Sequence, residues 1–232
     1  MDETTNGSMN EEARAFAEAL RAQNAGYGFL ARLFRAEVDE GTLADLRAMK
    51  LPAATGNERL DAGYRRLAAY LNGVWERTRT ELAVDFFHTF IGTTQDTHAV
   101  AFPYESVYTS PDRLLMQDAR DEVLAAYRAA CLVLVDEVCE PEDHLSFELE
   151  FAQLLGARAT GAFEAGDEEA CAQLLQARRA FMDAHLMNWV PSFADDVERI
   201  AQTEFYRALA LVLRGVLEVD RAFLDEALAP AA

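Results

Sequence analysis

Basic residues are scarce in this sequence, and lysine is almost missing. The 232 residues include 40 acidic and 21 basic side chains, Lys50 is the single lysine, and the net charge is −19. Nucleic-acid binding requires a basic face and docking on anionic lipid requires basic clusters, so the sequence predicts neither. Two explanations of the acidic surplus stay open, namely solubility alone and electrostatic steering of a cationic partner.

Cysteines and long apolar runs are also few. The three cysteines, Cys131, Cys139 and Cys171, are odd in number and lack metal-site spacing, so we expect reduced thiols. Apolar runs such as 209–213 are too short to span a bilayer, and no apolar stretch follows the acidic start of the chain. We therefore expect a cytoplasmic protein without stable membrane association.

Motifs of catalysis and cofactor binding are missing as well. The four histidines, His88, His98, His144 and His185, form neither HExxH nor the paired Glu-x-x-His motifs of di-iron bundles. No glycine-rich phosphate loop and no G-x-S-x-G sequence occurs. We predict no catalytic residue, no cofactor, no metal and no enzyme activity. A nucleotide-binding hydrolase is an alternative that lacks support from any phosphate-binding loop.

Helical periodicity and the absence of strand-like alternation predict an all-α chain. The sequence is rich in alanine, leucine, glutamate and arginine, with 12 glycines and 6 prolines among its 232 residues. Residues 1–9 are polar, and we expect them to be disordered. The expected helices cover residues 11–35, 42–49, 58–77, 81–92, 111–130, 141–165, 168–186, 192–202 and 204–228.

The stretch 140–144, with the sequence EPEDH, marks the expected start of one of these helices. Proline suits the first turn, and Glu142 and Asp143 would then meet the positive end of the helix dipole. His144 does not fit this pattern, because the same dipole disfavours a protonated ring. We therefore expect a ring that is neutral, or one that is held charged by a carboxylate.

The apolar helix after this stretch contains a carboxylate. At 100° per residue, Glu148 falls between two apolar stripes, and a helix that is apolar over most of its surface lies deep in a protein. A carboxylate in that position needs a partner. The partner is either a group of a bound peptide or an arginine of this chain, such as Arg120 or Arg128.

The segment 93–109 is a long irregular stretch that contains Phe102, Pro103, Tyr104 and Tyr108. A loop of this length within a compact domain is functional or disordered, and its aromatic side chains argue against disorder. Aromatic residues beside prolines favour a binding groove, with burial in the core as the alternative.

Five motifs in order resemble the TorD/DmsD family of cytoplasmic redox-enzyme maturation chaperones. They are EPEDH at 140–144, FFHTFIG at 86–92, PYESVY at 103–108, HLMNW at 185–189 and FYRAL at 205–209. The resemblance implies a TorD-like all-α bundle of about ten helices in two lobes. We expect a disordered 1–9, an N-terminal lobe at 10–138, a hinge at 139–145 and a C-terminal lobe at 146–232.

The resemblance also implies a function. Proteins similar to this one bind the twin-arginine signal peptide on the apo-form of a molybdopterin oxidoreductase subunit, and hold it until the cofactor is inserted, before export. Two alternatives stay open. One is a nitrate-reductase-type assembly chaperone for a non-exported apo-enzyme, and the other is a structural helical adaptor. We expect a monomer or a domain-exchanged dimer.

The resemblance implies peptide-contact residues at the positions of this sequence that match the family's motifs. Helical periodicity adds Glu148 to this set. Thr89 and Asn188 depart from the family pattern, and so do two of the aromatic positions, where some members have tryptophan. A twin-arginine signal peptide has two guanidinium groups followed by an apolar segment. A protein that binds it therefore requires carboxylates beside an apolar aromatic surface. Residues 129–157 contain seven acids and no lysine or arginine. We expect Asp143 to contact an arginine of the peptide, and His144 either to orient Asp143 or to contact the peptide backbone. The expected peptide-binding residues are Phe86, Phe90, Pro103, Tyr104, Pro141, Asp143, His144 and Glu148.

Overall fold

The computed structural model describes residues 3–52, 54–92, 98–132 and 140–229. Within these residues the chain forms ten α-helices and two π-helical segments, which confirms the predicted all-α fold. The elements are α1 (Glu3–Arg35), α2 (Glu40–Ala48), α3 (Glu58–Asn72), α4 (Thr78–Phe86), η1 (Phe87–Ile91), α5 (Glu105–Thr109), α6 (Asp118–Ala129), α7 (Leu145–Glu164), α8 (Glu168–Phe181), η2 (Met182–Leu186), α9 (Val190–Ile200) and α10 (Glu204–Ala227).

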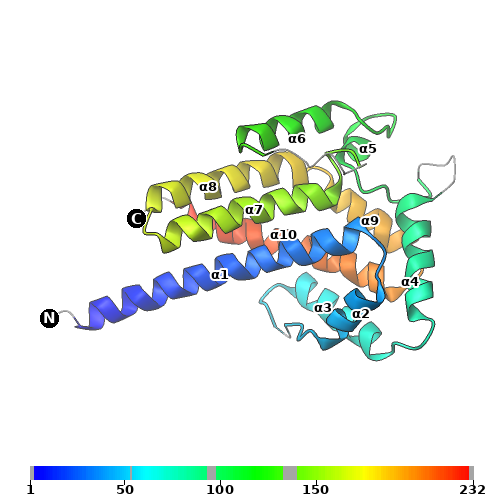
Figure 1. Cartoon of the computed structure of the whole chain (residues 1–232), viewed down its shortest axis with the longest axis horizontal. Helices are drawn as coiled ribbons and strands as arrows, with labels where there is room; N and C mark the ends of the chain where they lie inside the picture. The colour runs from blue at the N-terminus through cyan, green and yellow to red at the C-terminus, as the bar shows by residue number, and fades with distance from the viewer. Residues whose placement is uncertain (1–2, 53, 93–97, 133–139, 230–232) are drawn as a thin grey trace.

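Long helices run beside one another along the molecule. α1 packs on α7, α7 packs on α8, and α10 packs on α3 and α9. Figure 1 shows α1, α7, α8 and α10 running lengthwise, with both termini at one end and α4 at the other. Helices from either side of residues 139–145 share one hydrophobic core. The expected division into two lobes therefore stays a prediction, and it does not correspond to two separate cores.

Several helix boundaries follow from local chemistry. Asp167 begins α8 as expected, because its side chain accepts a hydrogen bond from the backbone N–H of Ala170 at 3.0 Å. Gly166, with φ +76°, ends α7 in the left-handed conformation that favours glycine. Gly92, with φ +52°, ends η1 in the same way.

Three expected helix starts were wrong. α1 begins at Glu3, because extending an existing helix is easier than nucleating one. α6 begins at Asp118, since Arg113 and Met116 have φ values of 50° and 58° and interrupt any helix from residue 111. α7 begins at Leu145, with His144 and not a residue near Pro141 as its N-cap.

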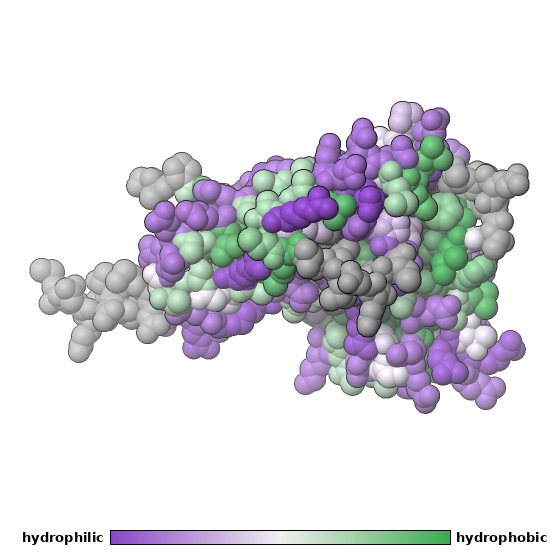
Figure 2. All heavy atoms as spheres, turned by 45° about the horizontal axis from the view of Figure 1, so that its top comes forward, coloured by the Kyte–Doolittle hydropathy of each residue, from purple (hydrophilic) through white to green (hydrophobic). Residues whose placement is uncertain are grey.

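One outer face of the fold carries exposed apolar side chains. Val84, Phe87 and Ile91 are 59%, 44% and 47% exposed and lie on α4 and η1. Figure 2 shows hydrophobic atoms gathered at this end of the molecule. No helix among the described residues is long and apolar enough to cross a membrane.

Candidate functional site

A short backbone pairing joins the aromatic loop to the EPEDH stretch. Tyr104 and His144 form an isolated antiparallel bridge. The N–H of Glu105 donates to the carbonyl of Asp143 at 3.0 Å, and the N–H of Leu145 donates to that of Pro103 at 2.8 Å. The two segments therefore lie next to each other, although His144 follows Glu105 by 39 residues in the sequence.

Asp143 lies inside the molecule, with no exposed surface. Its Oδ2 atom accepts a hydrogen bond at 2.8 Å from the backbone N–H of Ser106, in the first turn of α5. A carboxylate in this position satisfies a helix N–H that lacks an intrahelical partner. Its Oδ1 atom has no hydrogen-bond partner among the described residues. In this conformation Asp143 caps a helix and does not face solvent.

His144 caps the next helix. Its Nδ1 atom accepts a hydrogen bond at 3.1 Å from the N–H of Ser146, and its ring packs edge-on against Tyr104 with centroids 5.0 Å apart. Burial, followed by the nearby charge of Arg35, lowers the pKa of His144 to about 3. The ring is therefore neutral at physiological pH, as one of the two sequence alternatives had it.

Glu148 lies among other buried acids. Its Oε2 atom accepts a hydrogen bond at 3.0 Å from the indole N–H of Trp189, while Oε1 has no partner among the described residues. Burial, and then the charges of Glu105 and Asp143, raise the pKa of Glu148 well above its usual range. The protonated form of this carboxyl is therefore favoured up to a higher pH than in a solvent-exposed glutamate. The suggested arginine partners were wrong, since Arg120 pairs with Glu142.

Glu105 connects this cluster to η2 and the turn that follows it. The amide of Asn188 donates to its Oε1 atom at 2.6 Å, and Nδ1 of His185 lies 3.0 Å from its Oε2 atom. Tyr127 of α6 also faces this acidic cluster, and burial together with the charge of Glu148 raises its pKa. The loop, α6, α7 and η2 therefore meet around buried polar groups.

Tyr104 and Pro141 are the expected contact residues that stay partly accessible. The hydroxyl of Tyr104 donates to the carboxylate of Glu140, which is exposed. Beside them, Glu142 pairs with Arg120 and keeps 21% of its side chain exposed. The accessible surface formed by Tyr104 and residues 140–142 thus combines an aromatic ring, a proline and carboxylates.

The other expected aromatic contacts belong to the core. Phe86 and Phe90 are 5% and 3% exposed and pack against each other with ring centroids 5.1 Å apart. Phe90 also packs on Tyr206, and Pro103 is buried. These side chains shape the site from within and reach a ligand only if the surrounding elements move.

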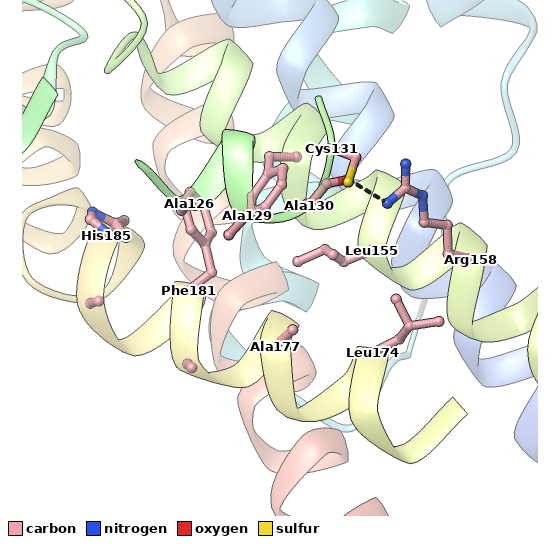
Figure 3. Close-up of a pocket in the computed structure, with 13 residues that line it drawn as sticks. Ala126, Ala129, Ala130, Cys131, Leu155, Arg158, Leu174, Ala177, Phe181 and His185 are labelled. Carbon is pink, nitrogen blue, oxygen red and sulfur yellow. Dashed lines mark hydrogen bonds between the residues drawn. The ribbon is translucent and has the colours of Figure 1, made fainter. Parts of the chain in front are cut away.

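An apolar groove lies between α6, α7 and α8, beside the hinge. Its volume is about 670 Å³, and its walls include Ala126, Phe151, Leu155 and Ala177. Figure 3 shows His185 and Arg158 at opposite ends of the groove. Because His185 also contacts Glu105, the groove begins at the buried acidic cluster.

This chain is similar in sequence to known proteins. Residues 57–195 match the family described as nitrate reductase delta subunit. The chain is 30% identical over 211 residues to the chaperone protein TorD of Vibrio cholerae serotype O1, covering 86% of this chain and 90% of the relative. It is 31% identical over 221 residues to TorD of Vibrio parahaemolyticus, covering 92% and 98%. The chain belongs to the TorD family. It is therefore related to redox-enzyme maturation chaperones and not to enzymes.

Sequence reasoning missed two features of this TorD-family chain. Glu105 received no role, although an acid directly after Tyr104 in an aromatic loop was a visible signal. The groove left only a weak trace, the recurrent alanines of α6 and α8. Two of the seven acids of residues 129–157, Asp136 and Glu137, lie outside the described residues, as does Cys139 at the start of the expected hinge.

Proposed function

We propose that this TorD-family chain binds the twin-arginine signal peptide of a molybdopterin oxidoreductase subunit at the surface of the hinge, in the cytoplasm. It holds the apo-subunit until the cofactor is inserted, before export. The observation that supports this most is the exposed Glu140 in contact with the partly exposed Tyr104, beside the partly exposed Pro141 and Glu142, in a chain of the TorD family. A guanidinium forms charge-assisted hydrogen bonds with carboxylates and stacks on aromatic rings.

The expected contact residues take two roles in this proposal. Tyr104 and Pro141 contact the peptide directly, because they are accessible in the described conformation. Asp143, His144 and Glu148 hold the two segments and α7 in place through caps and buried hydrogen bonds. Phe86, Phe90 and Pro103 support this surface from the core.

Charge reversal at Glu140 tests the proposal. We expect Glu140→Lys to weaken the binding of a synthetic twin-arginine signal peptide by about 1–3 kcal/mol in isothermal titration calorimetry. The substitution replaces an attractive charge by a repulsive one. Glu226→Lys is the matched control, because this residue is also exposed but lies at the end of α10. Equal affinities for the two variants would count against the proposed surface.

A second function in the same class stays open. The matched family carries the description nitrate reductase delta subunit, which favours an assembly chaperone for an apo-enzyme that is not exported. Affinity capture of the partner from its native host separates the two. A captured subunit with a twin-arginine leader supports the signal-peptide proposal, and one without a leader supports the alternative.

A further inference from the structure

The groove between α6, α7 and α8 has a defined polarity. On α6, Asp118 and Glu122 are exposed and precede Ala126 by eight and four residues. Side chains four residues apart share one face of a helix, so these acids continue the alanine wall toward the start of α6. One end of the groove is therefore acidic.

The opposite end is basic. Arg158 lies on α7, 13 residues after Leu145, which is roughly 20 Å along a helix. Its guanidinium donates to the carbonyl of Ala130 at 2.9 Å, next to the groove (Figure 3). No carboxylate of the described residues lies within ion-pair distance of Arg158. Its positive charge therefore acts on the groove without local compensation from that part of the chain.

The walls favour a helical occupant. Ala129, Ala177 and Ala180 are exposed and line the groove, and small side chains allow another helix to approach closely. The wall helices already use their backbone groups internally, so an apolar occupant must satisfy its own N–H and C=O groups. An α-helix does this by itself.

The length of the groove suits one kind of partner. From Leu174 to His185 the wall of α8 and η2 spans eleven residues, or roughly 16 Å. The apolar stretch of a signal peptide has about 7–15 residues, which form a helix of comparable length. Such a peptide begins with cationic residues, and its helix has a positive N-terminal end and a negative C-terminal end.

We infer that the α6–α7–α8 groove holds the apolar stretch of the signal peptide as a helix, with its cationic start at the Asp118–Glu122 end and its C-terminal end at Arg158. This inference rests on the proposed function and adds the place and direction of the peptide. The acidic rim faces the arginines and the positive end of the peptide helix. Arg158 faces the negative end, so the reversed orientation places like charges together at both ends.

Filling the groove tests its occupancy. Ala129→Trp places an indole in the groove, whereas Ala125→Trp places one on the same helix outside it, and both positions are exposed. We expect the first variant to bind the peptide at least about tenfold more weakly than the second, because the apolar stretch loses its burial. Circular dichroism of both variants shows that the fold is kept.

Photo-crosslinking of the wild-type protein tests the direction and needs no variant. A photoreactive residue at the N-terminal end of the apolar stretch should crosslink near Glu122, and one at the C-terminal end should crosslink near Arg158. Crosslinks in the opposite order, or only outside the groove, would overturn the inference. So would a second copy of the chain in the groove, detected as a dimer that Ala129→Trp disrupts while peptide binding is unchanged.

The outcomes separate the inference from the function on which it rests. If the wild-type protein does not bind the peptide, the proposed function fails and the inference fails with it. If the wild-type protein binds and Ala129→Trp binds as tightly as Ala125→Trp, only the placement in the groove fails.

Discussion

At the scale of single residues, buried polar groups of residues 143–148 serve the fold as caps and hydrogen-bond partners. Asp143 caps α5, His144 caps α7, and Glu148 accepts from Trp189. The residue types at 140–144 predicted a helix start near Pro141, whereas α7 begins at Leu145, and they gave a neutral His144 as one of two alternatives. The capping of α5 by Asp143 was not predictable, because it joins segments 37 residues apart that meet only in the folded chain.

A titration of stability tests the state of His144. Its pKa is about 3 when folded and 6.5 when unfolded, so the unfolded chain binds the extra proton between these values. The contribution of His144 to the free energy of unfolding is therefore fully present above pH 6.5. It falls toward pH 3 by up to about 1.4 kcal/mol per pH unit. His144→Asn keeps a capping side chain without the titration, and urea unfolding from pH 7 to 4 should show a shallower decline. Parallel curves for the two proteins would contradict the buried neutral ring.

Glu148 should act in the opposite pH direction. Its pKa is raised in the folded protein, so the folded chain keeps a proton that the unfolded chain releases. This contribution to stability is complete below the unfolded pKa of about 4.3 and is lost as pH rises toward the folded pKa. Glu148→Gln keeps an acceptor for Trp189 without a titrating proton, so its urea stability should decline less than that of the wild type from pH 5.5 to 8.5. An equal decline in both proteins would refute the raised pKa of Glu148.

At the scale of helices, buried polar contacts hold α1, α8 and α10 together. The guanidinium of Arg178 lies 3.0 Å from Asp220, and both side chains are completely buried. The hydroxyl of Tyr27 donates to Asp220 at 2.8 Å, and Arg178 also donates to Asn24 at 3.0 Å. Helical periodicity predicted these helices, but it did not predict which charges would meet between them. The π-helical segments were also unpredicted, because their extra residue leaves no signal in the pattern.

Two glycines of α7 give a matched test of this packing. A Cβ atom at Gly156 would overlap Asn24 and Arg178, whereas a Cβ atom at Gly161 would meet nothing within 4 Å. We expect Gly156→Ala to destabilise the protein by about 2–3 kcal/mol through overpacking. Gly161→Ala should stabilise it by about 0.5–1 kcal/mol, because alanine favours a helix. Thermal unfolding of both variants checks whether their stability changes have opposite signs. Equal changes would show that helix propensity alone determines the stability of both variants.

At the scale of the whole molecule, the described helices of this TorD-family chain surround one core, with Glu140, Pro141 and Glu142 at its surface. The fold class was predictable because five motifs between residues 86 and 209 agree with one family and helical periodicity is strong. The accessible site was less predictable, since sequence alone does not separate an aromatic residue in the core, such as Phe86, from an accessible one, such as Tyr104. The net charge of −19 favours association with a cationic peptide.

In the proposed function, carboxylates beside an apolar surface recognise the paired arginines of a signal peptide. Calorimetric titration of the wild-type protein with a twin-arginine peptide, and with the same peptide carrying glutamine at both positions, tests it most directly. We predict at least about tenfold tighter binding of the arginine peptide, with the difference shrinking as salt is added. Equal affinity for the two peptides would contradict recognition of the paired arginines by these carboxylates.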